Sequence, residues 1–288
     1  MKELHLNAYA KVNLGLDVLA PRDDGFHEIA TVLHTVALHD DIFLREQGDG
    51  IRVTSTGESI PTGPDSLVYR AAAMLREQHG VTRPVEIEIR KHIPVAAGLG
   101  GGSADAAVTL MGLAQMWKIR LDGRELMALA ARLGSDIPFF LTGGAAVARG
   151  RGERVQRLPA LPATWVVLAR PRIPVLTQWA YGQIRLQEIA HRPDIAALAE
   201  AVRRRDVPAV GRLLCNVFEN VVAAHHPVVA ELKAQILRGE AYGAAMTGTG
   251  PTVFGLMANE AAARRVAETL GAMPDVDVIV TRTFAEER

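Results

Sequence analysis

The stretch PVAAGLGGGSADAA at 94–107 combines residue types that could bind an anionic group. Glycine has no side chain and readily adopts positive φ, so a glycine run lets several backbone N–H groups converge on one ligand. The alanine-rich sequence behind it predicts a helix beginning near Ala104, and the N-terminus of a helix attracts negative charge. The sequence therefore predicts a phosphate site, and a glycine-rich turn without a ligand is the alternative. The contributing residues would be Pro94, Val95, Ala96, Ala97, Gly98, Leu99, Gly100, Gly101, Gly102, Ser103 and Ala104.

Two common phosphate-binding motifs do not fit this stretch. A Walker A loop needs Lys and then Ser or Thr after its last glycine, and no lysine lies between Gly98 and Ser103. A dinucleotide fingerprint needs a buried parallel strand directly before it. The preceding strand, VEIEIR at 85–90, is charged on one face, and HIPVAA at 92–97 does not extend it. The molecule that carries the phosphate must therefore be inferred from other residues.

Three further stretches carry polar residues that could act with the glycine run. Lys11 and Asn13 share one face of a predicted strand, Asp136 separates small residues from an apolar run, and MTGTGPTVF at 246–254 predicts a glycine turn between strands. Each has an ordinary alternative in isolation: a solvated edge lysine, a helix N-cap aspartate and a hairpin turn. The type and order of these residues therefore matter more than any one of them.

Composition indicates a soluble globular protein. The chain has 288 residues, enough for two compact domains, with 49% hydrophobic and 22% charged residues. The chain has 32 basic residues (Lys and Arg) and 32 acidic residues (Asp and Glu), so no overall electrostatic field attracts nucleic acid or an anionic membrane. The single cysteine, Cys215, excludes an intrachain disulfide and a zinc site built from several thiolates. Polar residues interrupt the N-terminal segment, which argues against a signal peptide, and we expect a cytoplasmic protein.

The elements that must position these residues follow from hydrophobic periodicity. The first fifty residues alternate as half-buried antiparallel strands do. LPALPAT at 158–164 predicts a boundary between a domain of residues 1–160 and a domain of residues 161–288. Both halves mix sheets and helices, so the predicted fold class is α+β. Other predicted helices are 66–78, capped by Asp65 or Ser66, 104–117, 123–133, several within 177–238, and 260–270; other predicted strands are 84–91, 144–149, 165–169, a pair flanking the turn of 246–254, and 276–283.

In this order, the Lys11 strand, the glycine run and the MTGTGPTVF turn resemble the three motifs of the GHMP superfamily of small-molecule kinases, which includes galactokinase, homoserine kinase and mevalonate kinase. The resemblance covers nearly the whole chain. It implies a ribosomal protein S5 domain 2-like N-terminal domain that binds ATP, a ferredoxin-like α/β sandwich C-terminal domain and an active site in the cleft between them. The most similar members act on a sugar alcohol joined to cytidine diphosphate, and the stretches at 10–29, 134–153 and 216–222 carry that likeness.

The resemblance also implies roles for individual residues. ATP and Mg²⁺ are the expected cofactors, with the glycine run around the β and γ phosphates. Asp136 would accept the proton of the substrate hydroxyl, and Lys11 would keep Asp136 ionised and stabilise the charge that develops on the transferring phosphoryl group. Ser103 would hold Mg²⁺ or a phosphate oxygen, with helix capping as its alternative.

Substrate contacts are carried over in the same way. Phe26 would stack on cytosine and His27 would bond to its polar edge, whereas family members usually carry tyrosine at the position of Phe26. Asparagine is common in the family where this chain has Ser66, and serine where it has Leu176, so the contacts of those positions are not carried over. The expected partner is this small molecule, with no nucleic acid or membrane and with a monomeric or homodimeric state. The full set of expected substrate residues is Asn13, Phe26, His27, Asp136, Thr177 and Gly248.

Other interpretations remain open or are set aside. The chain could phosphorylate another small alcohol, such as homoserine or mevalonate, or it could be an inactive relative that binds nucleotide as a regulatory module. The residues 39–41 (HDD) and the pair His225 and His226 lack a third metal ligand at useful spacing, so solvated turns are predicted there. The run 203–205 (RRR) is predicted to be an exposed helix end.

Overall fold

The computed structural model describes residues 3–284 and divides the chain into two compact units. Unit 1 comprises Met1–Ala10, Leu38–Val95 and Gly100–Thr142, and unit 2 comprises Lys11–Ala37, Ala96–Leu99 and Gly143–Arg288. Two long strands, β1 (Glu3–Pro21) and β2 (His27–Arg45), contribute residues to both units. The units interleave along the chain, and the domain boundary between residues 160 and 161 stays a prediction.

The strands of unit 1 follow the predicted alternation. β4 (Val85–Arg90) pairs antiparallel with the Asp41–Arg45 end of β2 and parallel with β3 (Ile51–Thr56). Val85, Ile87 and Ile89 are buried. The prediction of a solvated turn at 39–41 is wrong, because these residues lie within β2 and Asp40 is fully buried.

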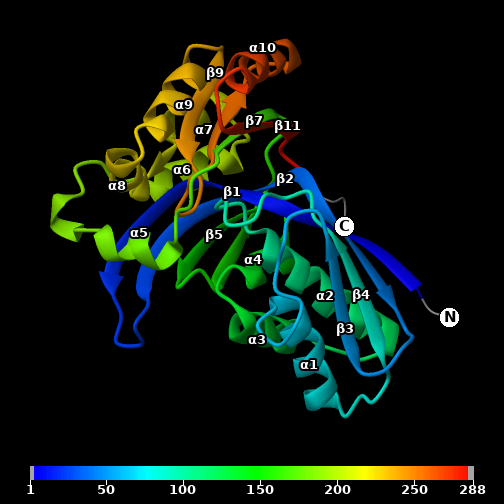
Figure 1. Cartoon of the computed structure of the whole chain (residues 1–288). Helices are drawn as coiled ribbons and strands as arrows, with labels where there is room; N and C mark the ends of the chain where they lie inside the picture. The colour runs from blue at the N-terminus through cyan, green and yellow to red at the C-terminus, as the bar shows by residue number, and fades with distance from the viewer. Residues whose placement is uncertain (1–2, 285–288) are drawn as a thin grey trace. The chain divides into compact units, whose positions relative to one another are not determined.

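Four helices pack in unit 1: α1 (Leu67–His79), α2 (Gly101–Trp117), α3 (Gly123–Leu133) and α4 (Ile137–Thr142). The predicted cap of the first helix is confirmed, since the Ser66 side chain accepts a hydrogen bond from the backbone of Tyr69. Figure 1 shows α1 and α2 side by side, and α2 also packs against α4. The predicted start of α2 near Ala104 is wrong, because the helix already begins at Gly101. Two of the glycines and Ser103 therefore form its first turn.

In unit 2, β5 (Ala145–Gly150) pairs antiparallel with residues 29–34 of β2 and with β6 (Arg154–Leu158). A two-residue strand, β8 (Cys215–Asn216), pairs in parallel with Gly15 and Leu16 of β1. This short strand was not predicted, because two residues carry no periodic signal. It fixes Asn216 beside the β1 strand.

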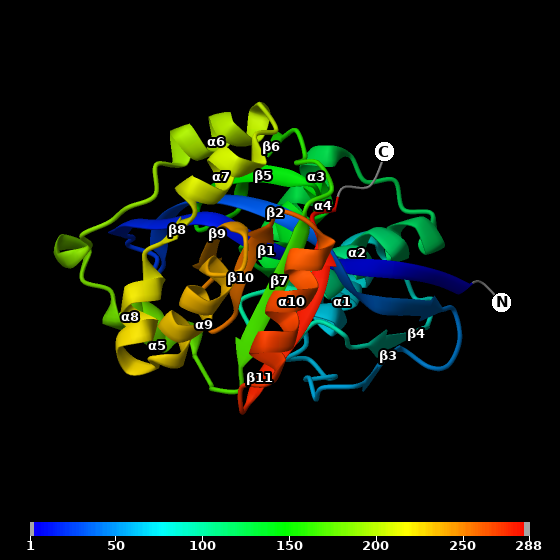
Figure 2. The ribbon, with the colours of Figure 1, turned by 90° about the horizontal axis from the view of Figure 1, so that it is seen from above.

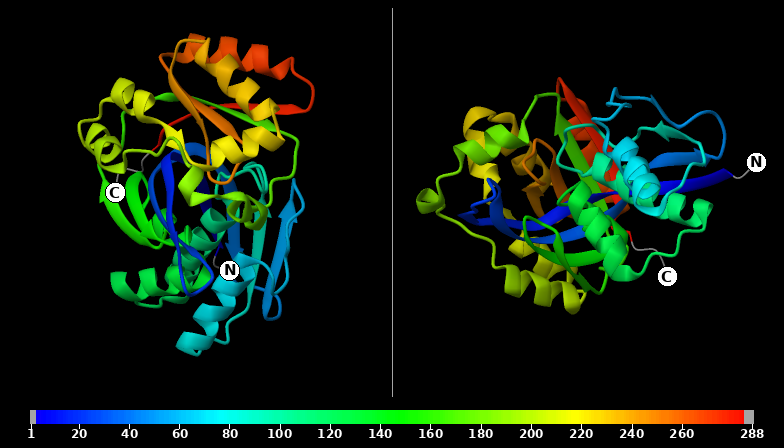
Figure 3. Two further views of the ribbon diagram at one scale, coloured as in Figure 1. Left: turned by 90° about the vertical axis from the view of Figure 1, so that its left-hand side faces the viewer. Right: turned by 90° about the horizontal axis from the view of Figure 1, so that it is seen from below.

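A second sheet of unit 2 has the order β11 (Val276–Arg282), β7 (Trp165–Pro171), β10 (Val253–Met257) and β9 (Ala241–Met246), with antiparallel neighbours. Figure 2 and Figure 3 show α9 (Val228–Leu237) and α10 (Glu260–Gly271) covering one face of it. Their buried side chains and those of the strands, such as Val167, Val253 and Leu232, form one apolar core. The remaining helices are α5 (Thr177–Gln183), η1 (Leu186–Glu188), α6 (Ile195–Arg203), α7 (Val207–Leu213) and α8 (Phe218–His225).

The element content confirms the predicted α+β class, including the strand, turn and strand around 246–254 and the exposed helix end at 203–205. Within residues 3–284, no helix has the length and apolar character needed to cross a membrane.

Candidate functional site

Lys11 is a buried cation held in a defined place. It lies in β1 with 3% of its surface exposed. Its ammonium donates to Asn13 Oδ1 at 2.7 Å and to the carbonyl oxygen of Gly98 at 2.6 Å. The ordinary alternative of a solvated edge lysine is therefore excluded. Within unit 2, the structure brings the predicted lysine against the predicted glycine stretch.

Asn13 connects Lys11 to the turn between β9 and β10. Its Oδ1 accepts hydrogen bonds from the backbone N–H of Gly248 at 2.9 Å and from the hydroxyl of Thr247 at 3.2 Å. Its amide nitrogen donates to the hydroxyl of Thr31 at 2.9 Å. The amide is 5% exposed, so its polar atoms need these partners. Asn13 thus positions Lys11 and Gly248, two residues predicted to belong to one site.

The turn itself packs closely on the glycine stretch. A side-chain carbon at Gly98, where φ is +76°, would lie 2.2 Å from the carbonyl oxygen of Thr247, so only glycine fits there. The amide of Asn216 donates to the carbonyl oxygens of Met246 at 2.7 Å and Gly248 at 2.8 Å. Asn216 was missed as a site residue, although the stretch NVFENVV contained it, because its partners lie about thirty residues later in the chain.

The exit of the glycine stretch, in unit 1, forms the N-terminus of α2. Gly100 is the N-cap of α2, with φ +74° and no capping side chain. Ala104 is the first residue whose N–H bonds back, to the carbonyl of Gly100 at 2.9 Å. The N–H groups of Gly101, Gly102 and Ser103 therefore have no partner within the helix and lie at its positive end. Ser103 is not the cap, so its hydroxyl is not used in that way.

Asp136 lies directly before α4 in unit 1 and is partly exposed. Its carbonyl oxygen accepts from the N–H of Phe139 at 3.1 Å. Among residues 3–284, no hydrogen bond or ion pair to its carboxylate is found, so the alternative of a capping aspartate is not observed. Lys11 belongs to unit 2, and the pairing of Lys11 with Asp136 stays a prediction.

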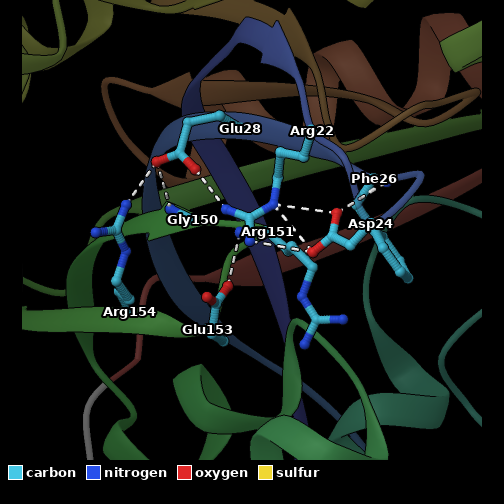
Figure 4. Close-up of polar contacts among 8 residues, drawn as sticks. All are labelled: Arg22, Asp24, Phe26, Glu28, Gly150, Arg151, Glu153 and Arg154. Carbon is cyan, nitrogen blue, oxygen red and sulfur yellow. Dashed lines mark hydrogen bonds and ion pairs between the residues drawn. The ribbon is translucent and has the colours of Figure 1, made fainter.

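Phe26 and His27 lie at the β1–β2 connection in unit 2. Phe26 is 49% exposed, and the guanidinium carbon of Arg151 lies 4.7 Å from its ring centroid. Figure 4 labels both side chains. The His27 ring lies 4.9 Å from that of Tyr181, which in turn packs edge-on against Phe218. Two aromatic groups of the predicted base site therefore each contact a side chain from a distant part of the chain: Phe26 contacts Arg151, and His27 contacts Tyr181.

Ion pairs hold this connection in place (Figure 4). Arg22 donates to Asp24 and to Glu28 at 2.8 Å, while Glu28 also accepts from Arg154 and from the N–H of Gly150. The hydrogen bond from Arg22 lowers the pKa of Asp24, whose carboxylate also accepts the N–H of Phe26. These groups are largely solvated, so they define the geometry of the turn more than they stabilise the fold.

Thr177 and Gly248 complete the predicted substrate set in unit 2. Thr177 is the first residue of α5, and its hydroxyl lies 3.2 Å from that of Thr249. The preceding residue, Leu176, is 70% exposed. Thr177 is thus joined to the turn that Asn13 and Asn216 hold. Its contact with a substrate stays a prediction.

Two family profiles and nearly full-length relatives match this chain. The profile for the GHMP kinases N terminal domain matches residues 66–144, and the profile for the GHMP kinases C terminal matches residues 198–275. The chain is 43% identical over 271 residues to 4-diphosphocytidyl-2-C-methyl-D-erythritol kinase of Alkaliphilus metalliredigens, covering 94% of this chain and 93% of that one. The chain belongs to the GHMP kinase family.

Further relatives support the same placement. The enzyme of that name from Pelotomaculum thermopropionicum is 44% identical, with 96% of each chain covered. A crystal structure of 4-(cytidine 5'-diphospho)-2C-methyl-D-erythritol kinase aligns with TM-score 0.82 and 35% identity over 98% of this GHMP kinase and all of that chain. A homoserine kinase from Cytophaga hutchinsonii aligns with TM-score 0.77 over 98% and 96% of the two chains, but at 23% identity it shows the fold alone. The two-domain GHMP kinase fold and the use of ATP as phosphate donor follow from family membership.

Proposed function

We propose that this chain transfers the γ-phosphate of ATP to the 2-hydroxyl of 4-diphosphocytidyl-2-C-methyl-D-erythritol, in the methylerythritol phosphate route to isopentenyl diphosphate. The observation that carries the proposal is identity above 40% to two enzymes of that name over more than 90% of every chain compared. Homoserine or mevalonate as the alcohol is less well supported, because a homoserine kinase and a mevalonate kinase of known structure are only 23% and 15% identical to this chain.

Phosphoryl transfer depends mainly on positioning and on stabilising charge. The unpaired N–H groups of Gly101, Gly102 and Ser103 would bind phosphate oxygens at the positive end of α2. The side chains of Ala97, Leu99 and Ala104 are buried, so this part of the chain offers its backbone to a ligand.

Asp136 is the proposed general base. Its partly exposed carboxylate is not engaged by another described residue, which leaves its oxygens available to the proton of a substrate hydroxyl. Lys11 would stabilise the negative charge that develops on the phosphoryl group as it transfers. The bonds from Lys11 to Asn13 and to Gly98 hold its ammonium in a fixed orientation for this role.

Phe26 and His27 are the proposed contacts of cytosine. An exposed Phe26 ring can stack on a base, since stacking needs no hydroxyl group. Tyr181 packs against the His27 ring and would restrict its orientation toward the polar edge of the base. Asn13, Thr177 and Gly248 would contact the erythritol portion from the turn described above.

Mg²⁺ is part of this proposal. Kinases hold this ion largely through the nucleotide's own phosphate oxygens, with few protein oxygens. The hydroxyl of Ser103 fits such a role, because it lies on the first turn of α2 and does not cap the helix. The ion would supply positive charge at the phosphates, and Ser103 would help to orient it.

The deciding experiment measures ATP consumption by the purified protein with Mg²⁺ and each of three alcohols: the cytidyl substrate, mevalonate and homoserine. We expect turnover with the cytidyl substrate alone. Turnover confined to mevalonate or homoserine would contradict the proposed substrate, although the chain would still be a kinase of small alcohols. ATP binding without turnover of any alcohol would favour the inactive regulatory relative. Light scattering of the same sample distinguishes a monomer from a homodimer.

A further inference from the structure

Unit 1 contains a buried cluster of charged residues that the proposed mechanism does not use. Lys91, Asp40 and Asp105, which we call the loop-base cluster, have side chains that are 2%, 0% and 1% exposed. The Lys91 ammonium donates to Asp40 and, at 2.8 Å, to Asp105 Oδ2. Burying a charged group costs free energy unless the group is paired, so we expect a cluster of this kind to have a structural or functional role.

The cluster lies at the two ends of the glycine stretch. At the entry, Asp40 Oδ1 accepts the backbone N–H groups of His92 at 2.6 Å and Ile93 at 2.8 Å, which directly precede Pro94. At the exit, Asp105 lies on the second turn of α2. Lys91 bonds to both carboxylates, so it joins the entry to the exit.

Gly101 brings the cluster next to the proposed phosphate site. A side-chain carbon at Gly101 would lie 3.2 Å from the Lys91 ammonium and 3.0 Å from the Ile93 side chain. The N–H of Gly101 is one of the three groups left unpaired by α2. The ammonium therefore lies behind the same backbone that would bind the phosphates.

We propose that Lys91, held between Asp40 and Asp105, is a positioning residue that fixes the two ends of the glycine stretch and so preorganises it for the phosphates of ATP. This proposal rests on the proposed function, since it takes the glycine stretch to bind ATP. Preorganised binding groups cost less ordering entropy when the ligand arrives. Loss of the cluster should therefore weaken nucleotide binding more than it slows the chemical step.

Asp105 is the best residue to change. Burial raises the pKa of its carboxyl group, against the opposing effect of Lys91. Asp105 Oδ1 has no hydrogen-bond partner among the described residues. Asp105→Ala leaves Lys91 paired with Asp40, so the variant keeps a matched buried pair and a helix-favouring residue.

The test measures the Kd of ATP with Mg²⁺ by calorimetry, together with KM for ATP and kcat. We expect Asp105→Ala to raise Kd and KM for ATP about tenfold, the effect of losing one hydrogen bond to a charged group. At saturating ATP, kcat should stay within about twofold of the parent value, because the groups at the reacting atoms are unchanged. Asp105→Asn, which can still accept from Lys91, should restore both constants.

The matched control is Thr109→Val, one turn further along the same face of α2. Thr109 is fully buried, and its hydroxyl has no partner among the described residues, so the change perturbs the helix without touching Lys91. A parent-like Kd in Asp105→Ala, or an equal loss in Thr109→Val, would overturn the proposal. A parent protein that binds ATP but phosphorylates no alcohol would contradict the proposed function, while the Kd of the variants would still decide the role of the cluster. A parent that does not bind ATP would overturn both.

Discussion

At the scale of single residues, Asp136 carries the proposed chemistry most directly. Asp136→Asn keeps the shape of the side chain but removes its basicity. We expect kcat to fall by about 10² to 10⁴, the usual contribution of a general base, while ATP affinity stays near the parent value. Asp122→Asn is the matched control, because Asp122 caps α3 and asparagine caps equally well. Parent-like turnover in Asp136→Asn would show that another group accepts the proton.

At the scale of elements, the glycine stretch depends on different glycines to different degrees. A side-chain carbon at Gly98 would collide with the carbonyl of Thr247, whereas at Gly102, inside α2, it would meet no atom within 4 Å. We expect Gly98→Ala to lower the free energy of unfolding by about 2 kcal/mol or more and to weaken ATP binding. Gly102→Ala should stabilise the protein by up to about 1 kcal/mol. Urea denaturation of both variants tests this contrast, and equal effects would contradict it.

Local signals in the sequence predicted most elements of the fold. Ser66 precedes a regular helical pattern, and the side chains of β4 alternate in burial. The residues of each element therefore contain the information that predicts it. The start of α2 was placed too late, because glycine has a low intrinsic helix propensity. Ile93 and Lys91 leave little room for a side chain at Gly101, and a propensity does not encode this tertiary contact.

The candidate site could be proposed from the sequence where family motifs contain its residues, but contacts between distant residues could not be predicted. Lys11, Asp136 and the glycine stretch were found through their resemblance to known motifs. Asp40 was assigned to a solvated turn, since its partner Lys91 lies 51 residues away. A lone aspartate in the alanine-rich helix, Asp105, was the one available signal of a buried charge.

At the scale of the whole molecule, His34 makes stability depend on pH. It is fully buried, accepts the N–H of Leu161 at Nε2 at 3.0 Å, and bonds through Nδ1 to the carbonyl of Thr35. Burial lowers its pKa from 6.5 to about 4. As pH falls, His34 therefore takes up a proton in the unfolded chain before it does so in the folded protein. Its contribution to stability is fully present above pH 6.5 and is lost progressively between pH 6.5 and about pH 4.

Chemical denaturation at pH 8 and pH 5 measures this effect. We expect the free energy of unfolding of the parent to fall by about 2 kcal/mol between pH 8 and pH 5 because of His34 alone. His34→Gln should be less stable than the parent at pH 8 but should lose less on acidification, since glutamine does not titrate. An identical loss in both proteins would assign the pH dependence to other groups.

The hydrogen bond between Gly248 and Asn13 also sets an order of events during synthesis. It joins residues 235 positions apart. At about 5 to 20 residues per second, Asn13 is made roughly ten to fifty seconds before its partner exists. Residues 38–95 and 100–142 of unit 1 are complete well before that, whereas Asn13 bonds to Gly248 only after the last part of unit 2 has been made. A nascent chain that stops before the β9–β10 turn therefore already contains Asn13 and Gly98, the partners of the Lys11 ammonium, but lacks the Thr247 and Gly248 groups that hold Asn13 in place.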